Sequence, residues 1–239
     1  MSFVLLLTAT INPKFSKLTN GRNNPSDREN DYYQAVSFYL SKGFKVVFVE
    51  NSNTFSEKIL SLNNKYNTLE YHCFESKYSY LGKSAGEVEI FQYAFSKSQF
   101  LKEVDYIIKV TGRYIIKNLL ELLTSTNFVE KEVYINPTRN LKWADSRLMI
   151  MKKSFYSKYF LKAVDLYLDE SKKVYMENTY MKSLFLYLLE GGELNLWPSY
   201  PIYEAYDGTH NEKISFTLLK KWKYTIYYEL KKFAFKHRA

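Results

Sequence analysis

Cysteine, histidine, proline and glycine are scarce in this chain of 239 residues, which contains one, three, five and eight of them respectively. A single thiol, Cys73, cannot form an intrachain disulfide, and three histidines leave too few ligands for a four-ligand zinc site. The lack of a disulfide framework favours a cytoplasmic location. No subset of the glycines spells G-x-G-x-x-G or G-x-x-x-x-G-K-[ST], so the standard dinucleotide and P-loop phosphate sites are excluded.

Long hydrophobic runs are also missing. The longest, such as Phe3–Leu7, fall far short of the ~18 apolar residues that predict a membrane span. The N-terminus has no basic region before this run, which therefore indicates a buried first strand rather than a signal peptide. With 46% hydrophobic residues, the chain is in the range of globular proteins, and we expect one main domain over residues 1–212.

Positive charge is concentrated at the C-terminal end. The formal net charge is +9, and residues 213–239 alone hold eight Lys/Arg against one Glu, a net charge of +7. Apolar residues recur there every three or four positions, which predicts an amphipathic helix. They are Phe216, Leu219, Trp222, Ile226, Leu230 and Phe233.

The predicted tail helix has two interpretations. It could lie on an anionic membrane, where each nearby Lys or Arg contributes ~1 kcal/mol and Trp and Phe anchor at the interface. It could instead pack its apolar stripe on the main domain and leave its lysines solvated. We do not expect a nucleic-acid partner, because the rest of the chain shows neither a basic stripe nor an RNP-like aromatic pattern.

Hydrophobic runs alternate with helical patterns through the first 150 residues, which is typical of an α/β sheet with helices on its faces. We predict strands at 3–9, 45–50, 69–74, 106–110, 132–136 and 147–151. We predict helices at 27–40, 55–63, 84–99, 115–124, 154–167 and 177–190. The second half would then form a helical cap on a single α/β sheet domain, followed by the tail helix at 213–239.

Polar side chains follow three of the predicted strands at the edge where ligands of open α/β sheets collect. Hydrogen-bonding groups after the second strand could hold a base or ribose, although Glu-Asn-Ser there is also ordinary turn chemistry. Cationic groups after the first and fourth strands could neutralise phosphate. The candidates are Thr8, Arg28, Glu50, Asn51, Ser52, Lys109, Thr111 and Arg113.

The stretch Gly82-Lys-Ser-Ala-Gly-Glu87 opens a predicted helix and adds Lys83 to these candidates. Its glycines permit close backbone approach, and the amides at a helix N-terminus attract anions. The same residues also suit an ordinary helix start with Ser84 as N-cap. The sequence therefore leaves a phosphate site and a plain helix start both open.

The order of these groups resembles that of small bacterial glycosyltransferases of lipopolysaccharide and capsule assembly, which have a glycosyltransferase-A fold. The resemblance covers about residues 3–150, and its most distinctive part is Lys109-Val-Thr-Gly-Arg-Tyr114. It implies a nucleotide-sugar donor, bound by the candidates named above together with Lys83. It also implies a glycan or glycolipid acceptor.

The resemblance has one departure, at the end of the fourth strand. Where that fold commonly delivers an Asp-x-Asp that holds a metal against the donor diphosphate, this chain reads Val110-Thr-Gly-Arg113. We therefore name no metal-binding residue and disfavour Mn²⁺ or Mg²⁺ as cofactor. A cationic Arg113 could neutralise the leaving phosphate instead.

In the resembled fold, the acceptor site and the general base come from the second half. A carboxylate can accept the proton of a sugar hydroxyl, which makes Asp145 and Glu177 the catalytic candidates. Arg147 and His210 are the candidates for binding the acceptor. Asp145 could equally be a turn residue, and Glu177 a first-turn carboxylate that complements a helix dipole.

These features lead to three hypotheses. The first is a glycosyltransferase, peripheral to the inner membrane on its cytoplasmic face, with a lipid-linked or lipopolysaccharide or capsule glycan acceptor. The second is a non-catalytic module that binds a membrane or a partner. The third is a sugar nucleotidyltransferase, which is weakened because such enzymes usually have a glycine-rich loop after the first strand and Thr8–Lys14 contains no glycine.

Overall fold

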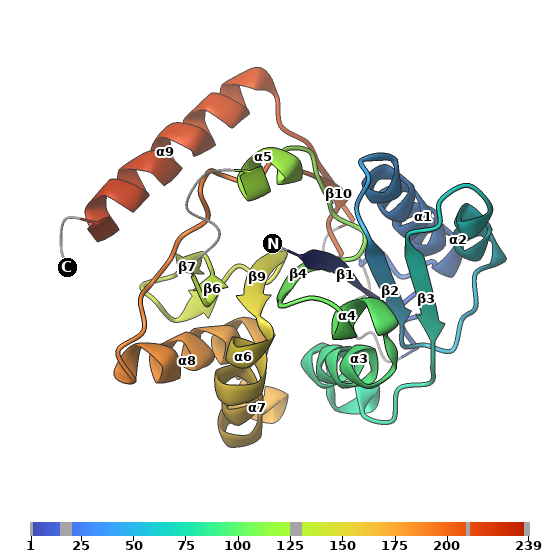
Figure 1. Ribbon diagram of the computed structural model, residues 1–239, viewed down its shortest axis with the longest axis horizontal. Coiled ribbons are helices and arrows are strands. Elements are labelled where there is room, and N and C mark those ends of the chain that lie inside the picture. Colours follow the sequence, from blue (N-terminus) through green and yellow to red (C-terminus); the bar gives the residue numbers. More distant parts are fainter. Residues whose placement is uncertain (1, 15–20, 125–130, 209–210, 237–239) are drawn as a thin grey trace.

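A computed structural model of the chain has three layers, a six-stranded sheet with helices on both faces (Figure 1). It describes residues 2–14, 21–124, 131–208 and 211–236. The sheet order is β3-β2-β1-β4-β9-β6. In that order the strands are Leu69–Cys73, Val46–Glu50, Phe3–Ala9, Tyr106–Thr111, Leu148–Lys152 and Val133–Tyr134.

The chain reverses its direction of travel across the sheet beside β1. β1 pairs in parallel with both β2 and β4, and β2 pairs in parallel with β3. The chain thus moves outward from β1 to β3 and then returns to form β4 on the other side of β1. β9 runs antiparallel to β4. In open α/β sheets, ligands bind outside the carboxyl ends of the strands at such a reversal, here between β1 and β4.

Two hydrophobic cores lie on the two faces of the sheet. Leu5 and Leu7 of β1 belong to one core, and Val4 and Leu6 to the other. The first core is covered by α1 (Pro25–Ser41), α2 (Glu57–Leu60) and α5 (Leu119–Thr124). The second is covered by α3 (Lys83–Lys97), α4 (Gln99–Lys102), α6 (Lys153–Phe155), α7 (Leu161–Tyr167) and α8 (Met176–Leu189). Because both faces are buried, the central strands are continuous apolar runs.

Short strands and a long terminal helix complete the chain. β5 (Ile115–Ile116), β10 (Tyr203–Tyr206) and β11 (Lys213–Ile214) form a small sheet, and β7 (Pro137–Thr138) pairs with β8 (Trp143–Ala144). A π-helical turn at Tyr156–Phe160 joins α6 to α7, and short 3-10 turns occupy Ser61–Asn64, Ser79–Leu81 and Glu170–Lys172. Helix α9 (Leu218–Lys236) lies along the outside of the molecule (Figure 1).

The predicted α/β class with a central sheet is confirmed, but several predicted elements are wrong in detail. The helix predicted from Ile115 begins as strand β5, because Ile115 pairs with Glu204, far away in sequence. The strand predicted at 132–136 keeps only two residues. Helix α1 begins at Pro25 rather than at Asp27, because the Asn24 side chain caps it by accepting from the amides of Ser26 and Asp27 and Pro25 suits the first turn.

The turn after β4 leaves little space for a side chain at Gly112, and a substitution can test this. A Cβ added to Gly112 would lie 2.7 Å from the Thr8 carbonyl oxygen and 3.2 Å from the Tyr32 ring. Because the first neighbour is backbone, we expect Gly112→Ala to lower the free energy of unfolding by about 1–3 kcal/mol, the range of overpacking substitutions. Urea denaturation followed by circular dichroism measures this loss.

Gly43→Asn is the matched control. Gly43 has φ +81°, which Asn tolerates, and an added Cβ would meet nothing within 4 Å. We expect a smaller loss there than at Gly112. If Gly112→Ala is as stable as the wild-type chain, the turn after β4 can accommodate a Cβ beside Thr8, and the prediction is wrong.

Candidate active site

Arg113 stands at the point where the sheet reverses. The Gly112 amide donates to the Thr8 carbonyl at 2.9 Å, and the Tyr114 amide donates to the Thr111 carbonyl at 2.8 Å, so a tight turn holds Arg113 against the end of β1. Its Nε and Nη1 atoms are buried and have no hydrogen-bond partner among the residues that the structure describes. Buried guanidinium nitrogens are costly without an acceptor, so this position suits an anionic ligand.

Two further cations lie close to Arg113. Lys83 is the first residue of α3, whose N-cap is Gly82 with φ +145°. Partial burial, followed by the charges of Arg113 and Arg28, lowers the pKa of Lys83, while Glu170 and Asp207 oppose this. Side chains from the start of α1, the start of α3 and the turn after β4 therefore form one cationic cluster, defined here as Arg28, Lys83 and Arg113.

A carboxylate of this chain occupies the N-terminus of α3. Glu170, from the 3-10 turn between α7 and α8, accepts a hydrogen bond from the Ser84 amide at 2.6 Å. The same carboxylate fills the space that a Cβ on Gly82 would need. Ser84 itself lies within the first turn rather than at the N-cap, and its Oγ accepts from the Met176 amide at 3.0 Å. The N-termini of α3 and α8 are thus held side by side.

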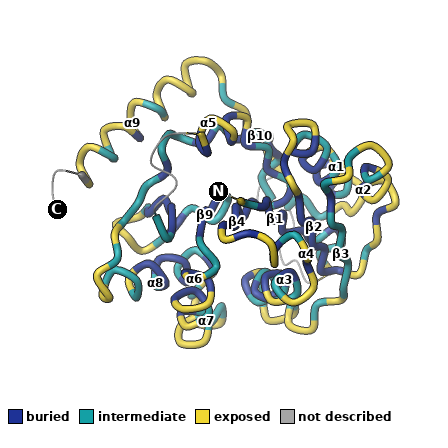
Figure 2. The backbone as a smooth tube through the Cα atoms, viewed as in Figure 1, coloured by how far each residue is buried: buried dark blue, intermediate teal, exposed yellow. Residues whose placement is uncertain are grey.

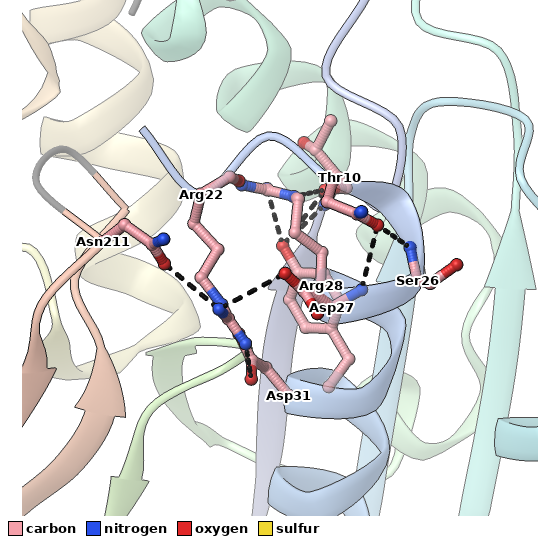
Figure 3. Close-up of polar contacts among 9 residues, drawn as sticks. Thr10, Arg22, Ser26, Asp27, Arg28, Asp31 and Asn211 are labelled. Carbon is pink, nitrogen blue, oxygen red and sulfur yellow. Dashed lines mark hydrogen bonds and ion pairs between the residues drawn. The ribbon is translucent and has the colours of Figure 1, made fainter. Parts of the chain in front are cut away.

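Arg28 contributes charge to the cluster but its donors are already engaged (Figure 3). Its Nε donates to the Thr10 carbonyl at 2.6 Å, and Nη1 and Nη2 donate at 3.0 Å to the Arg22 carbonyl and the Tyr32 hydroxyl. Burial, together with the nearby charge of Arg113, lowers the pKa of Arg28. The side chain holds the β1–α1 connection in place and acts on a ligand through its field.

Arg22 connects Asn211, in the segment after β10, to Asp31 of α1. Its Nε and Nη2 atoms bind the two carboxylate oxygens of Asp31 at 2.7 and 3.0 Å, and Nη1 donates to Asn211 at 3.1 Å (Figure 3). The Arg22 amide donates to the Gly208 carbonyl at 3.3 Å. Gly208 packs so tightly on the Arg113 guanidinium that a Cβ would overlap it. Arg22 therefore helps to hold Gly208 against the Arg113 guanidinium.

The polar residues after β2 hold loops together. Glu50 is fully buried, and its Oε1 accepts from the amides of Ile11 and Ser52, each at 2.9 Å, while Oε2 accepts from the Thr54 amide at 3.0 Å. Ser52 Oγ donates to Glu50 and accepts from the Asn12 amide at 2.9 Å. The predicted role of Glu50 and Ser52 in holding a base or ribose is therefore not supported, because their polar atoms are already engaged.

Asn51 is also engaged, between β1 and α3. Its Oδ1 accepts from Thr10 Oγ1 at 2.7 Å, and its Nδ2 donates to the Gly86 carbonyl at 3.1 Å. A Cβ on Gly86 would lie 2.9 Å from this Nδ2, so the glycine allows the close approach. Asn51 thus fixes the start of α3 against the sheet.

Lys109 cannot contact a donor as predicted, because its side chain is fully buried. Side chains alternate between the two faces along β4, so Lys109 lies on the same face as Ile107, toward the core beneath α3 and α8. Its Nζ forms an ion pair with Glu87 and donates to the Ser146 carbonyl at 2.6 Å. Thr8 is buried beside the Gly112 turn, whereas Thr111 is half-buried at the strand end, with its Oγ1 3.4 Å from Lys109 Nζ.

The two catalytic candidates lie in different surroundings. Glu177, in the first turn of α8, accepts from Ser146 Oγ at 2.9 Å, and burial raises the pKa of its carboxyl group, with a further contribution from Glu87. Asp145 is bound bidentately by Arg147, with Oδ1–Nε 2.8 Å and Oδ2–Nη2 2.6 Å. A carboxylate with both oxygens committed to a guanidinium is a poor proton acceptor, so Glu177 is the better candidate.

The two residues assigned to the acceptor are placed less favourably. Arg147 is committed to Asp145, and its guanidinium lies 4.1 Å above the Tyr203 ring. His210 lies outside the described residues. Within the described ranges there is also no group of three His, Cys, Asp or Glu side chains that could hold a metal ion. The expectation that no metal takes part stays a prediction.

Three side chains near the site were not assigned a role from the sequence. Glu87 ends the quoted Gly82–Glu87 stretch, so its position at the α3 start was visible. Ser146 lies between two assigned residues, Asp145 and Arg147. Glu170 had no local signal, because its contact with Ser84 spans 86 residues.

Comparisons with known proteins find similar solved structures but assign the chain to no family. No protein-family model and no curated protein sequence matches it. Similar solved structures include glycosyltransferase GlyE of Streptococcus pneumoniae, at 9% identity and a TM-score of 0.49, over 83% of this chain but only 46% of that one. Galactosyltransferase LgtC in complex with donor and acceptor sugar analogues matches at 11% identity and a TM-score of 0.45, over 77% and 70% of the two chains.

A synthase is similar over nearly its whole length. It is 4-diphosphocytidyl-2C-methyl-D-erythritol synthase of Anaerococcus prevotii, at 10% identity and a TM-score of 0.44, over 95% of this chain and 98% of that one. At such identities and TM-scores the likeness does not assign an activity.

The carboxylate at the α3 N-terminus predicts how the cationic cluster responds to anions. In Glu170→Gln the amide oxygen can still accept from the Ser84 amide, but the negative charge beside Lys83 is gone. We expect inorganic pyrophosphate to bind roughly tenfold more tightly, because like charges a few ångströms apart repel strongly near a protein surface. Isothermal titration calorimetry at two salt concentrations measures this gain.

Glu121→Gln removes an exposed carboxylate from α5, on the other face of the sheet, and serves as the charge-matched control. Its affinity for pyrophosphate should equal that of the wild-type chain. Equal affinities in all three proteins would mean that Glu170 does not compete with a bound anion.

Proposed function

We propose that this chain is a glycosyltransferase that moves a sugar from a nucleotide-sugar donor to a lipid-linked or lipopolysaccharide or capsule glycan acceptor. The observation that carries the proposal is the half-buried Arg113 side chain at the β1–β4 reversal, whose buried Nε and Nη1 atoms have no hydrogen-bond partner among the described residues. Lys83, the first residue of α3, lies beside it. Together they form a site suited to the diphosphate of such a donor.

The cationic cluster would act on the bond that breaks. When the sugar leaves the diphosphate, negative charge develops on the phosphate oxygen that had carried it. Fixed positive charges at that position stabilise the transition state more than the ground state. We propose that Arg113 and Lys83 supply this charge without Mn²⁺ or Mg²⁺.

Glu177 would act on the bond that forms. Ser84 and Met176 are hydrogen bonded, so the α8 start that carries Glu177 adjoins the α3 start that carries Lys83. In a direct displacement, an acceptor hydroxyl oxygen attacks the anomeric carbon, the bond to the diphosphate breaks, and the hydroxyl proton passes to Glu177. A carboxyl group with a raised pKa is suited to this transfer, because its conjugate base holds the proton more strongly.

A sugar nucleotidyltransferase is the competing enzymatic proposal, since the same cations could bind a nucleoside triphosphate. The two reactions differ in product, because glycosyl transfer releases a nucleoside diphosphate or monophosphate and nucleotidyl transfer releases pyrophosphate. The adjoining starts of α3 and α8, which carry Lys83 and Glu177, favour glycosyl transfer. A non-catalytic module would bind these ligands without releasing either product.

Helix α9 supports the proposed location at the cytoplasmic face of a membrane. Most of α9 is exposed along its length (Figure 2). The exposed fractions of Leu219, Trp222 and Ile226 are 84%, 68% and 55%. Among its described side chains Tyr228 alone is buried; its hydroxyl donates to the Trp197 carbonyl at 3.2 Å. Within α9 the apolar stripe is therefore exposed, whereas Phe216, before the helix, packs against the first core. No helix in the described part of the chain is long and apolar enough to cross a membrane.

The chemistry of α9 fits an anionic lipid surface. Residues 213–239 carry a net charge of +7, and the exposed side chains combine lysines with Trp222 and aliphatic groups. Such a helix lies in the interface with its apolar groups among the acyl chains and its cations near the phosphates. We propose that α9 holds the active site near a membrane-embedded acceptor.

Arg113→Ala tests the catalytic proposal. We expect release of nucleotide from a panel of UDP-, GDP- and CMP-sugars to fall by at least ~10²-fold, the scale of losing one preorganised electrostatic stabiliser. The wild-type chain must first identify the donor that it turns over. Product analysis of the released nucleotide and pyrophosphate distinguishes the two enzymatic proposals.

Arg139→Ala, an exposed arginine of the β7–β8 hairpin, is the control and should retain full activity. Melting curves of both variants show whether the fold is kept. Near-normal turnover by the Arg113 variant would remove Arg113 from the site, and no turnover by the wild-type chain on any donor would favour a binding module.

The triple variant Leu219→Ser, Trp222→Ser and Ile226→Ser tests the membrane proposal. It leaves Tyr228 and its contact with Trp197 in place, so the melting temperature should stay near the wild-type value. We expect binding to vesicles that contain anionic lipid to weaken at least about tenfold, because apolar insertion is lost. Vesicle co-sedimentation at rising salt measures the electrostatic share.

Leu189→Ser is the matched control, because Leu189 at the end of α8 is also 84% exposed. Its vesicle binding should be unchanged. Wild-type affinity in the triple variant, or binding that does not depend on anionic lipid, would contradict the proposal and point to a protein partner for α9.

A further inference from the structure

A buried polar network lies between α3, β4 and α8, behind the cationic cluster. Lys109 Nζ is paired with Glu87 of α3, and Tyr180 of α8 donates its hydroxyl to the same Glu87 oxygen at 3.1 Å. Lys109 Nζ also lies 5.8 Å from the Tyr180 ring centroid. Lys109 and Tyr180 are fully buried, so water does not solvate the Lys109–Glu87 ion pair on the side that these two residues cover.

Ser146 connects this network to Glu177. Its carbonyl oxygen accepts from Lys109 Nζ at 2.6 Å, while its hydroxyl donates to Glu177 Oε1 at 2.9 Å. Lys109 thus holds the backbone of the residue whose side chain holds Glu177. The order of contacts is Tyr180, Glu87, Lys109, Ser146 and Glu177.

Stability does not account for this arrangement. Lys109 lies at a fully buried position of β4, between the fully buried apolar residues Ile108 and Val110. Buried ion pairs cost desolvation, and apolar residues of similar volume often stabilise a fold as well or better. The titratable group joined to Lys109 through Ser146 is Glu177.

We propose that Glu87 and Lys109 are positioning residues that set both the orientation and the protonation of Glu177, the proton acceptor of the proposed transfer. The proposal rests on the proposed function for the role of Glu177. It concerns electrostatic coupling, which exists in the protein without substrate.

The direction of each contribution is defined by charge. Burial raises the pKa of Glu177; the Ser146 hydrogen bond lowers it, Glu87 raises it and Lys109 lowers it. Tyr180, which also faces Glu177, stays protonated, because burial and Glu87 raise its pKa well above the usual tyrosine value. The groups that face Glu177 from α3, β4, α8 and the β8–β9 connection are therefore Glu87, Lys109, Tyr180 and Ser146.

Charge-removing variants separate these contributions. Glu87→Gln keeps an oxygen for Lys109 and Tyr180 but removes a negative charge, so the pKa of Glu177 should fall. Lys109→Met removes the opposing positive charge, so the pKa of Glu177 should rise. Should the second variant fail to fold with Glu87 left unpaired, the double variant Glu87→Gln, Lys109→Met replaces the whole pair with neutral groups and should give a pKa above that of Glu87→Gln alone.

The pKa of Glu177 is measured in the full chain by ¹³C NMR titration of labelled glutamate carboxyl groups. Glu177→Gln identifies the resonance. Glu103→Gln, which removes an exposed carboxylate just before β4 at the opposite edge of the sheet, is the control and should leave the Glu177 titration in place. Once a donor is known, the acid limb of the pH–rate profile should move to lower pH in Glu87→Gln, because Glu177 is the active base when ionised.

The outcomes separate this proposal from the proposed function. A Glu177 titration that moves down in Glu87→Gln, moves back up when Lys109 is also removed, and is unmoved in Glu103→Gln supports the coupling. The same titration in wild type, Glu87→Gln and the double variant overturns it and leaves the pair a structural one. A coupled titration in a chain that turns over no nucleotide-sugar supports the coupling and rejects the proposed transfer.

Discussion

The hydrogen bond from the Gly112 amide to the Thr8 carbonyl is the contact on which the site depends. It closes the turn after β4 onto the end of β1, where the chain reverses its direction across the sheet. Only a residue without a Cβ fits there, since the Thr8 oxygen would lie 2.7 Å from that atom. With the turn closed, Arg113 lies beside the ends of β1 and β4, and its guanidinium packs against Gly208.

A cluster of like charges must be held together by the fold around it. Arg28 and Arg113 both act to lower the pKa of Lys83, so the three cations repel one another, and Glu170 and Asp207 offset part of this. The Arg22–Asp31 ion pair and the loop contacts of Glu50 provide the rigid frame. Functional sites are where a protein tolerates such unfavourable local energies, because the ligand relieves them.

How much the sequence reveals depends on the range of the interaction that decides each feature. Central strands and long helices follow from local apolar patterns, so β1 was predicted to the residue and α3 and α8 to within two. The positions of Arg113, Lys83 and Glu177 followed from strand and helix ends. Their partners did not, because the Ser84–Glu170 contact joins segments 86 residues apart and burial of Lys109 depends on strand parity. The same reason hid the loop-holding role of Glu50.

The attachment of α9 joins the proposed membrane surface to the site through a short path. Lys231 donates to Asn136 and to the Pro137 carbonyl, and burial lowers the pKa of this lysine to about 8. The Asn136 carbonyl in turn accepts from the Asp145 amide at 3.0 Å, one residue before Ser146, which binds Glu177. A helix held this closely differs from one on a flexible linker, whose reach varies with its length. Its exposed side therefore fixes one orientation of the candidate site to any surface that it contacts.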